Sequence, residues 1–283
     1  MTFYLIFQLV LIIETGAGLE TLFHYNTHYN IAKRFGSHNT YLSLYLVFSV
    51  GVYLNKLVKN KKYRLFTLLL IISSVLYIVI LASRSQFIAL GILLIVSAII
   101  YIFNKRELAK GVIAIFLISG LLFFLMKNVH FLSYRFDKIM EREFNIENID
   151  KRGDKRFYRW KSIYNHIDKN TLFGYGTGDE MENLNTFYQQ DNLFSAINKY
   201  NAHNEYISTY IRWGWIGLVL LVIFLIYQFS LSIKNKDYLY FVFILIIAHL
   251  CLYESIFGVQ KGIVFFFFFS SLFLHKYKIQ SID

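Results

Sequence analysis

Residues 65–103 read LFTLLLIISSVLYIVILASRSQFIALGILLIVSAIIYIF and contain one charged residue, Arg84. As a single helix these 39 residues would be about 58 Å long, roughly twice the hydrocarbon thickness of a bilayer. The chain must therefore turn, and Ser83-Arg84-Ser85-Gln86 is the polar place at which it can do so. We expect two membrane helices joined by a tight hairpin that holds Arg84 at the far membrane face.

Further apolar segments extend this pattern along the whole chain, of which 56% is hydrophobic and which contains no proline. Their lengths suit helices that cross a bilayer, whereas the strands of a membrane barrel would alternate with a period of two. The segments are Thr2–Phe23, Tyr41–Leu57, Gly111–Met126, Tyr206–Ile233, Leu239–Tyr253 and Gly262–Leu274. The predicted fold is all-α, a polytopic transmembrane bundle of about eight helices with one large, mainly helical outward-facing loop.

The predicted organisation has three parts. Membrane helices 1–5 occupy residues 1–126, the hydrophilic loop or cap occupies 127–205, and membrane helices 6–8 with a short cytoplasmic tail occupy 206–283. Within the loop, Phe173-Gly174-Tyr175-Gly176-Thr177-Gly178 predicts a turn, because three alternating glycines do not hold a helix. The spacing of Tyr134, Ile139, Phe144 and Trp160 suggests short amphipathic helices in the first half of the loop.

The net charge of +11 reflects topology and not a nucleic-acid partner. The loop holds 12 basic and 12 acidic residues, so the excess lies elsewhere, mostly in short loops between the apolar segments. Short loops rich in Lys and Arg mark the cytoplasmic side of a membrane protein. We therefore predict membrane lipids as partners and no nucleic acid. The single cysteine, Cys251, lies in an apolar segment and offers no disulfide framework.

Two arginine positions are candidates for binding an anion. Arg84 could face an anionic head group or diphosphate, or it could extend to the lipid head groups as hairpin residues often do. In Arg156-Phe157-Tyr158-Arg159-Trp160, guanidinium groups beside aromatic rings could clamp a phosphate and stack on a sugar. From the residues alone, a solvated amphipathic helix with its aromatic face turned inward is the favoured explanation of the second group.

His203-Asn204-Glu205 is the sharpest candidate for catalysis, because it lies where the hydrophilic loop meets the sixth apolar segment. An imidazole there could accept a proton from a sugar hydroxyl while Asn204 orients it, or the group could form an interfacial turn that caps the helix. Glu254, the single acid of the seventh segment, could pair with Arg212 or Lys261, or act as an alternative base. No histidine pair has metal-ligand spacing within a plausible helix, so we predict no metal and no cofactor.

Five short motifs, in order, resemble the O-antigen ligase/polymerase family of bacterial membrane proteins. The resemblance spans Arg34 to Leu274. The motifs are Arg34-Phe35-Gly36-Ser37-His38-Asn39, Ser83-Arg84-Ser85-Gln86-Phe87, Arg156-Phe157-Tyr158-Arg159-Trp160, Leu172-Phe173-Gly174-Tyr175-Gly176 and Ala202-His203-Asn204-Glu205-Tyr206 with Gly214-Trp215-Ile216-Gly217. Leu172 stands where the family pattern has proline.

The resemblance implies a metal-independent glycosyltransferase of surface polysaccharide assembly in the bacterial inner membrane, with a periplasmic loop. The donor would be a glycan on undecaprenyl diphosphate, and the acceptor a hydroxyl of lipid A–core or of a growing glycan. Arg84 and Arg156 would stabilise the diphosphate, and His203 would take the acceptor proton or orient the acceptor. Arg159, Trp160, Asn204, Tyr206 and Glu254 are expected to contact substrate.

Two departures and two alternatives accompany this interpretation. Arg212 stands where the family usually has an acidic residue, and relatives usually carry several more N-terminal helices. A repeat-unit polymerase of the same family fits the motifs as well as a ligase. A transporter or flippase of an anionic lipid-linked substrate fits less well, because it has little need for paired Arg-aromatic and His-Asn groups in a soluble cap.

Overall fold

The computed structural model describes residues 36–59, 62–81, 83–105, 120, 156–168 and 171–280. Every regular element in these ranges is a helix, which confirms the all-α prediction. The expected helices at Thr2–Phe23 and Gly111–Met126 lie outside them, apart from Gly120, as do Tyr134, Ile139 and Phe144. The chain divides into two compact units, residues 1–137 and 138–283.

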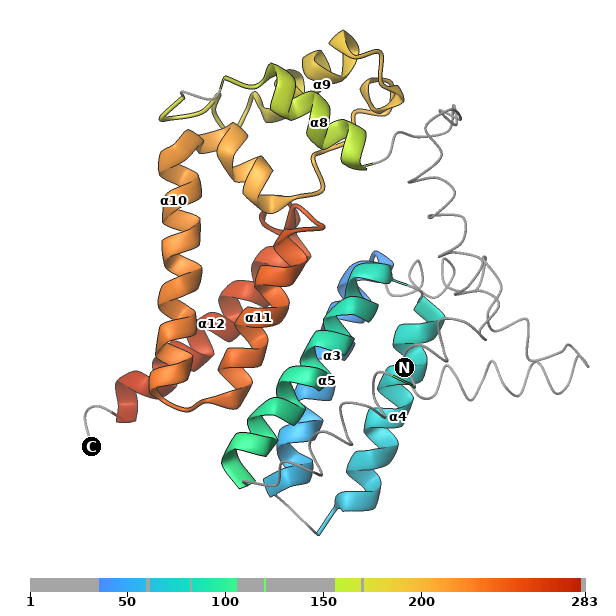
Figure 1. The fold of residues 1–283 in the computed structure, drawn as a ribbon, viewed down its shortest axis with the longest axis vertical. Coiled ribbons are helices and arrows are strands. Elements are labelled where there is room, and N and C mark those ends of the chain that lie inside the picture. Colours follow the sequence, from blue (N-terminus) through green and yellow to red (C-terminus); the bar gives the residue numbers. More distant parts are fainter. Residues whose placement is uncertain are drawn as a thin grey trace, which may run out of the picture. The chain divides into compact units, whose positions relative to one another are not determined.

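The first unit contains three long apolar helices, α3 (Asn39–Lys59), α4 (Arg64–Leu81) and α5 (Arg84–Lys105), drawn in blue to green in Figure 1. Each is long and apolar enough to cross a membrane. Helix α3 packs against both α4 and α5. Side chains at the contacts are fully buried, among them Leu44, Val47, Ile78 and Leu93. By contrast, α4 exposes Leu65, Phe66, Leu69 and Ile72, as expected of a face that meets lipid.

The predicted hairpin between α4 and α5 is present and is tighter than expected. Helix α4 ends at Leu81 and α5 begins at Arg84, so Arg84, Ser85 and Gln86 already form the first turn of α5. Ser85 and Gln86 are buried, whereas Arg84 is exposed. The hairpin therefore presents a guanidinium at the N-terminus of a membrane helix.

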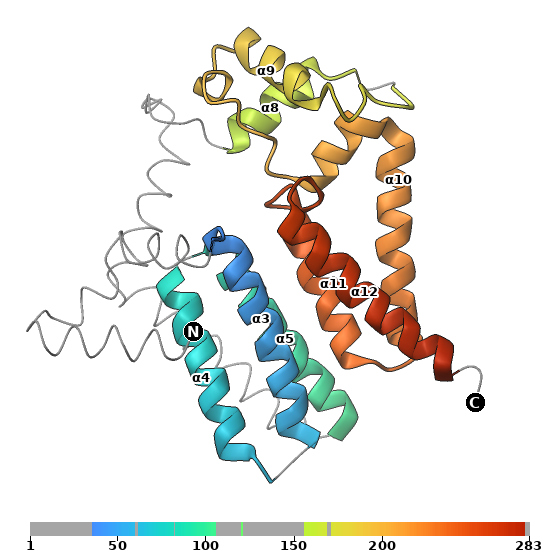
Figure 2. The ribbon, with the colours of Figure 1, turned by 180° about the vertical axis from the view of Figure 1, so that it is seen from behind.

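The second unit contains the three C-terminal helices, α10 (Glu205–Lys234), α11 (Tyr238–Cys251) and α12 (Gln260–Gln280). Figures 1 and 2 show them as a bundle in orange to red. Aromatic rings join α11 to α12: Phe243 stacks on Phe266 and Tyr240 on Phe273. Asp237 caps α11 by accepting from the amides of Leu239 and Tyr240. All three helices agree with the apolar segments.

Helix α10 is broken at Gly214, where both views show a sharp bend. Gly214 has φ 61° and ψ −155°, a conformation that suits glycine. The chain from Thr171 to Gly176 lies across the break and completes its hydrogen bonds. Tyr175 and Gly176 donate to the carbonyls of Ile211 and Arg212, while Trp215 and Ile216 donate to Thr171 and Leu172.

Close backbone contact explains the glycines of this crossing. A Cβ on Gly174 would lie 2.6 Å from backbone atoms of residues 211–214, and one on Gly214 would lie 2.5 Å from the carbonyl of Leu172. The predicted glycine-rich turn is confirmed. Because its glycines lack side chains, the backbone of the loop can contact the backbone of the broken helix.

A small helical cap rests on the start of α10. It contains α8 (Arg156–His166), α9 (Glu180–Gln190) and the 3-10 helix η2 (Phe194–Ala196). One hydrophobic core joins these pieces to α10, built from the buried side chains of Ile163, Ile167, Leu184, Phe187, Tyr188, Ala202 and Ile211. The Ser162 hydroxyl also donates to the Phe187 carbonyl, which ties α8 to α9. The cap and the first turns of α10 therefore form one packed body.

Candidate functional site

The candidate site is built around the short loop that leads into α10. His203 has φ 47°, a left-handed conformation that a non-glycine residue adopts at an energetic cost. The Asn201 side chain supports this turn, since its Oδ1 accepts from the His203 amide at 3.1 Å. The loop therefore fixes the backbone from which the imidazole projects.

Two residues of α8 hold the same loop by its carbonyl groups. Arg159 Nη1 donates to the Asn201 carbonyl at 3.2 Å, and Trp160 Nε1 donates to the Ala202 carbonyl at 2.7 Å. Arg159 is buried, and its guanidinium also lies against the Tyr200 ring. These contacts give Arg159 and Trp160 a supporting role beside His203, while their predicted contact with substrate stays a prediction.

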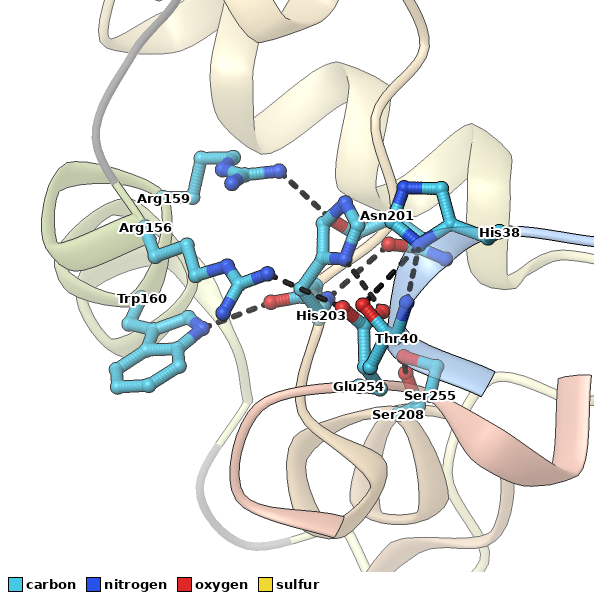
Figure 3. Close-up of polar contacts among 11 residues, drawn as sticks. His38, Thr40, Arg156, Arg159, Trp160, Asn201, His203, Ser208, Glu254 and Ser255 are labelled. Atoms are coloured by element: carbon cyan, nitrogen blue, oxygen red, sulfur yellow. Dashed lines mark hydrogen bonds and ion pairs between the residues drawn. The ribbon is translucent and has the colours of Figure 1, made fainter. Parts of the chain in front are cut away.

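One carboxylate brings the imidazole and a second arginine together. Glu254 Oε2 lies 3.0 Å from His203 Nδ1, and Glu254 Oε1 lies 3.2 Å from Arg156 Nη2. Figure 3 shows the two side chains approaching Glu254 from different elements. The exposed fractions of the side chains are 11% for Glu254, 30% for His203 and 37% for Arg156. The two nitrogen-bearing groups thus remain open to solvent, while the carboxylate beneath them is largely enclosed.

The loop that carries Glu254 is fastened to the first turn of α10. Glu205 Oε2 accepts from the Phe257 amide at 2.8 Å, and the hydroxyls of Ser208 and Ser255 lie 2.8 Å apart. The short helix η3 (Ile256–Gly258) follows directly. Glu205 and Ser208 belong to the helix that begins just after His203. The start of α10 therefore anchors both the loop that carries His203 and the loop that carries Glu254.

Arg212 forms a separate, buried cluster, so of the alternatives open for Glu254 the pairing with Arg212 is not the one that forms. Its Nη2 lies 2.6 Å from Glu205 Oε1, and its Nε lies 3.1 Å from Glu180 Oε2. Glu205 is fully buried and lies two turns from Arg212 on the same side of α10, which explains why this pair forms. The arginine that pairs with Glu254 is instead Arg156.

Asn204 and Tyr206 take structural contacts in the described chain. Asn204 is the N-cap of α10, where its Oδ1 accepts from the Ile207 amide at 3.1 Å. The Tyr206 hydroxyl donates to the Ala248 carbonyl at 3.1 Å and thereby joins α10 to α11. Capping was one of the two interpretations open for Asn204, and a role in substrate contact stays a prediction for both residues.

Arg84 belongs to the first unit and His203 to the second, so their meeting around one substrate stays a prediction. Within the described residues, no three His, Cys, Asp or Glu side chains form a cluster that could hold a metal ion. The chemistry that this arrangement offers is proton transfer at an imidazole beside a guanidinium that can neutralise an anion.

The cap contains a second histidine–carboxylate pair. His166 Nε2 lies 2.8 Å from Asp191 Oδ1 at the other end of α8 from Arg156. The hydrogen bond with His166 lowers the pKa of Asp191 below its ordinary value. Arg156 and His166 are about 15 Å apart along the helix, given its rise per residue.

Sequence reasoning found His203, Arg156 and Glu254 singly and missed their junction, together with Asn201. The signal for Asn201 was slight, an Asn two residues before a histidine at a helix start. A family model described as O-antigen ligase matches residues 66–222. No curated protein and no solved structure matched the chain.

Proposed function

Because that match covers more than half of the sequence, the chain belongs to the O-antigen ligase family of membrane glycosyltransferases, and we propose that it transfers a glycan from undecaprenyl diphosphate to an acceptor hydroxyl at the periplasmic face. The acceptor in this proposal is lipid A–core, as for a ligase. The supporting observation is the junction at which His203 and Arg156 meet opposite oxygens of Glu254.

The proposed reaction is a displacement at the anomeric carbon of the donor. The acceptor oxygen forms a bond to this carbon while the bond between the carbon and the diphosphate oxygen breaks. His203 Nε2 takes the proton of the acceptor hydroxyl, and undecaprenyl diphosphate leaves with the bonding electrons. Negative charge therefore grows on the leaving diphosphate, where fixed guanidinium groups stabilise the transition state.

Arg156 suits the diphosphate because its guanidinium is partly exposed beside His203. An arginine carries five N–H donors, and Glu254 engages one nitrogen of Arg156. The remaining donors can bind phosphate oxygens in a planar, two-pronged contact. We assign Arg84 to the same diphosphate, because it stands exposed at the N-terminus of α5, where the helix dipole also favours an anion.

The test of this proposal is glycan transfer by the purified protein in vesicles that contain the lipid-linked donor and lipid A–core. His203→Gln should lower the rate about 100-fold or more, the usual contribution of a general base. His166→Gln is the matched control, since it alters a paired histidine of the same cap and should transfer at the wild-type rate. Wild-type transfer by His203→Gln would overturn the assignment of the base.

A matched pair of lysine variants tests the assignment of Arg84. Arg84→Lys should impair transfer, because a lysine ammonium is a point charge and does not reproduce the planar fork. Arg64→Lys makes the same change at the first residue of α4, on the predicted cytoplasmic side, and should have little effect. In a deletion strain, free lipid-linked chains would indicate a lost ligase, whereas single repeat units on the acceptor would indicate a polymerase.

A further inference from the structure

Glu254 is more enclosed than either group it contacts, and it receives a donor on each oxygen. Its side chain is 11% exposed, against 30% for His203 and 37% for Arg156. A substrate that reaches the junction from solvent would meet the imidazole and the guanidinium before it met the carboxylate. The position of Glu254 therefore suits control of its neighbours better than contact with substrate.

Resting on the function proposed above, we propose that Glu254 is a positioning residue that sets the tautomer and orientation of His203 and fixes Arg156 beside it. An ionised carboxylate only accepts hydrogen bonds, so the nitrogen that faces it, His203 Nδ1, must carry a hydrogen. In the neutral ring, Nε2 then has the unshared electron pair. The acceptor proton goes to Nε2, and Glu254 stays ionised throughout and receives no proton.

The surroundings of Glu254 meet the rigidity that such a role requires. Its loop is held by the hydrogen bond from the Phe257 amide to Glu205 and by the Ser208–Ser255 contact, both from the first turn of α10. The backbone of His203 is held by Asn201, whose side chain accepts from the His203 amide. The backbone segments that carry His203 and Glu254 are thus both held in place, and the Glu254 carboxylate is the group that orients the imidazole ring itself.

Because Arg156 contacts the other oxygen of Glu254, the variant Glu254→Gln is informative about the tautomer of His203. In Glu254→Gln, one amide atom accepts hydrogen bonds and the other donates them. Arg156 is a donor only, so the amide oxygen should face Arg156 and the amide NH₂ should face His203. His203 Nδ1 would then have to accept, which moves the ring hydrogen to Nε2 and removes the proposed base.

The experiment compares Glu254→Gln and Glu254→Asp with the wild type in the vesicle assay. Glu254→Gln should lower kcat at least 100-fold with KM for the donor changed less than threefold. In the serine-protease triad the corresponding amide substitution lowers kcat about 10⁴-fold by imposing the wrong tautomer. Glu254→Asp keeps the charge and should recover at least a tenth of the wild-type kcat.

A spectroscopic measurement separates tautomer control from a general loss of structure. In protein labelled with ¹⁵N-histidine, the His203 signals, assigned by their loss in His203→Gln, should report hydrogen on Nδ1 in the wild type. In Glu254→Gln they should report hydrogen on Nε2. Asp191→Asn is the matched control, because it alters a histidine–carboxylate pair elsewhere in the cap and should leave the His203 signals and kcat unchanged.

The outcomes distinguish this inference from the proposed function. Full kcat in Glu254→Gln, or an unchanged His203 tautomer, would overturn the positioning role while the function stood, provided His203→Gln remained inactive. A large rise in KM with unchanged kcat would overturn it in favour of direct substrate contact. Full activity of His203→Gln would overturn the proposed base itself, and the positioning role with it.

Discussion

Two glutamates near the start of α10, Glu205 and Glu254, each pair with an arginine, but the two pairs differ in how far solvent reaches them. Glu205 is fully buried, and its carboxylate accepts from Arg212, Thr209 and the Phe257 amide. Glu254 lies under Arg156 and His203, which both remain partly exposed. The same residue types thus form a closed cluster in one place and an open one in the other.

The comparison separates a structural use of charge from a chemical one. A buried ion pair of this kind is closed off from a ligand in solvent, and its value lies in joining elements. The Glu205 cluster joins α10 to α9 through Glu180 and to the Glu254 loop through Phe257. The closed cluster therefore supports the open one, and a change in the first should disturb the second.

Arg212→Ala should have the largest effect, because it leaves the fully buried Glu205 without its cationic partner. Removing one member of a buried pair typically costs about 3–5 kcal/mol of unfolding free energy. Thermal unfolding of the detergent-solubilised protein would measure the loss. Arg156→Ala should cost less, about 1 kcal/mol, because Arg156 is partly exposed and Glu254 keeps its contact with His203. Equal losses in the two variants would break the distinction between the clusters.

Trp160→Phe should have an intermediate effect on stability and a visible one on transfer. The change removes the indole donor from the carbonyl of Ala202, a fully buried residue, and an unsatisfied acceptor there costs about 1–2 kcal/mol. The loop before His203 should loosen, so the transfer rate should fall. Trp215→Phe applies the same substitution to a half-exposed indole of α10. A transfer rate as low in the control as in Trp160→Phe would argue against the supporting role.

Asp191→Asn should have the smallest effect, since its partner His166 lies at the cap surface. The folded-state pKa of Asp191 is lowered by the hydrogen bond with His166, so the pair stabilises the fold above the unfolded pKa of about 3.9. That contribution should disappear as the pH falls through the lowered pKa. We expect a difference between variant and wild type below about 1 kcal/mol at pH 6, which shrinks as the pH falls below about 3.9. A difference that does not shrink on acidification would contradict this origin.

Hydropathy predicted the membrane helices well because lipid imposes a length on apolar segments. The segment Tyr206–Ile233 became α10, Glu205–Lys234, and Gly262–Leu274 became the core of α12, Gln260–Gln280. The glycine-rich turn at residues 173–178 was also readable from the sequence. Its partner, the break at Gly214, was not, because a helix with two interior glycines, Gly214 and Gly217, is an ordinary pattern until another segment is known to cross it.

The site could be predicted only as separate residues. Arg156 and Glu254 are 98 positions apart, and His203 and Glu254 are 51 apart, so no local periodicity relates them. The pairing of Glu254 with Arg212 was a reasonable expectation from charge alone, and it failed because Glu205 lies on the same face of the same helix as Arg212. The positions of the residues in the fold decide which carboxylate each arginine contacts. A count of charges along the sequence does not contain this information.

The break at Gly214 also bears on the depth at which the proposed chemistry would lie in a membrane. From Trp215 to Lys234 the helix is about 30 Å long, which is the thickness of the hydrocarbon layer. Trp213 and Trp215, both half-exposed, flank the break, as tryptophans do at a lipid–water boundary. If this stretch is the one that crosses the membrane, the segment before the break, which begins just after His203, would lie among head groups and water, where a sugar hydroxyl and a proton can arrive without crossing the hydrocarbon layer.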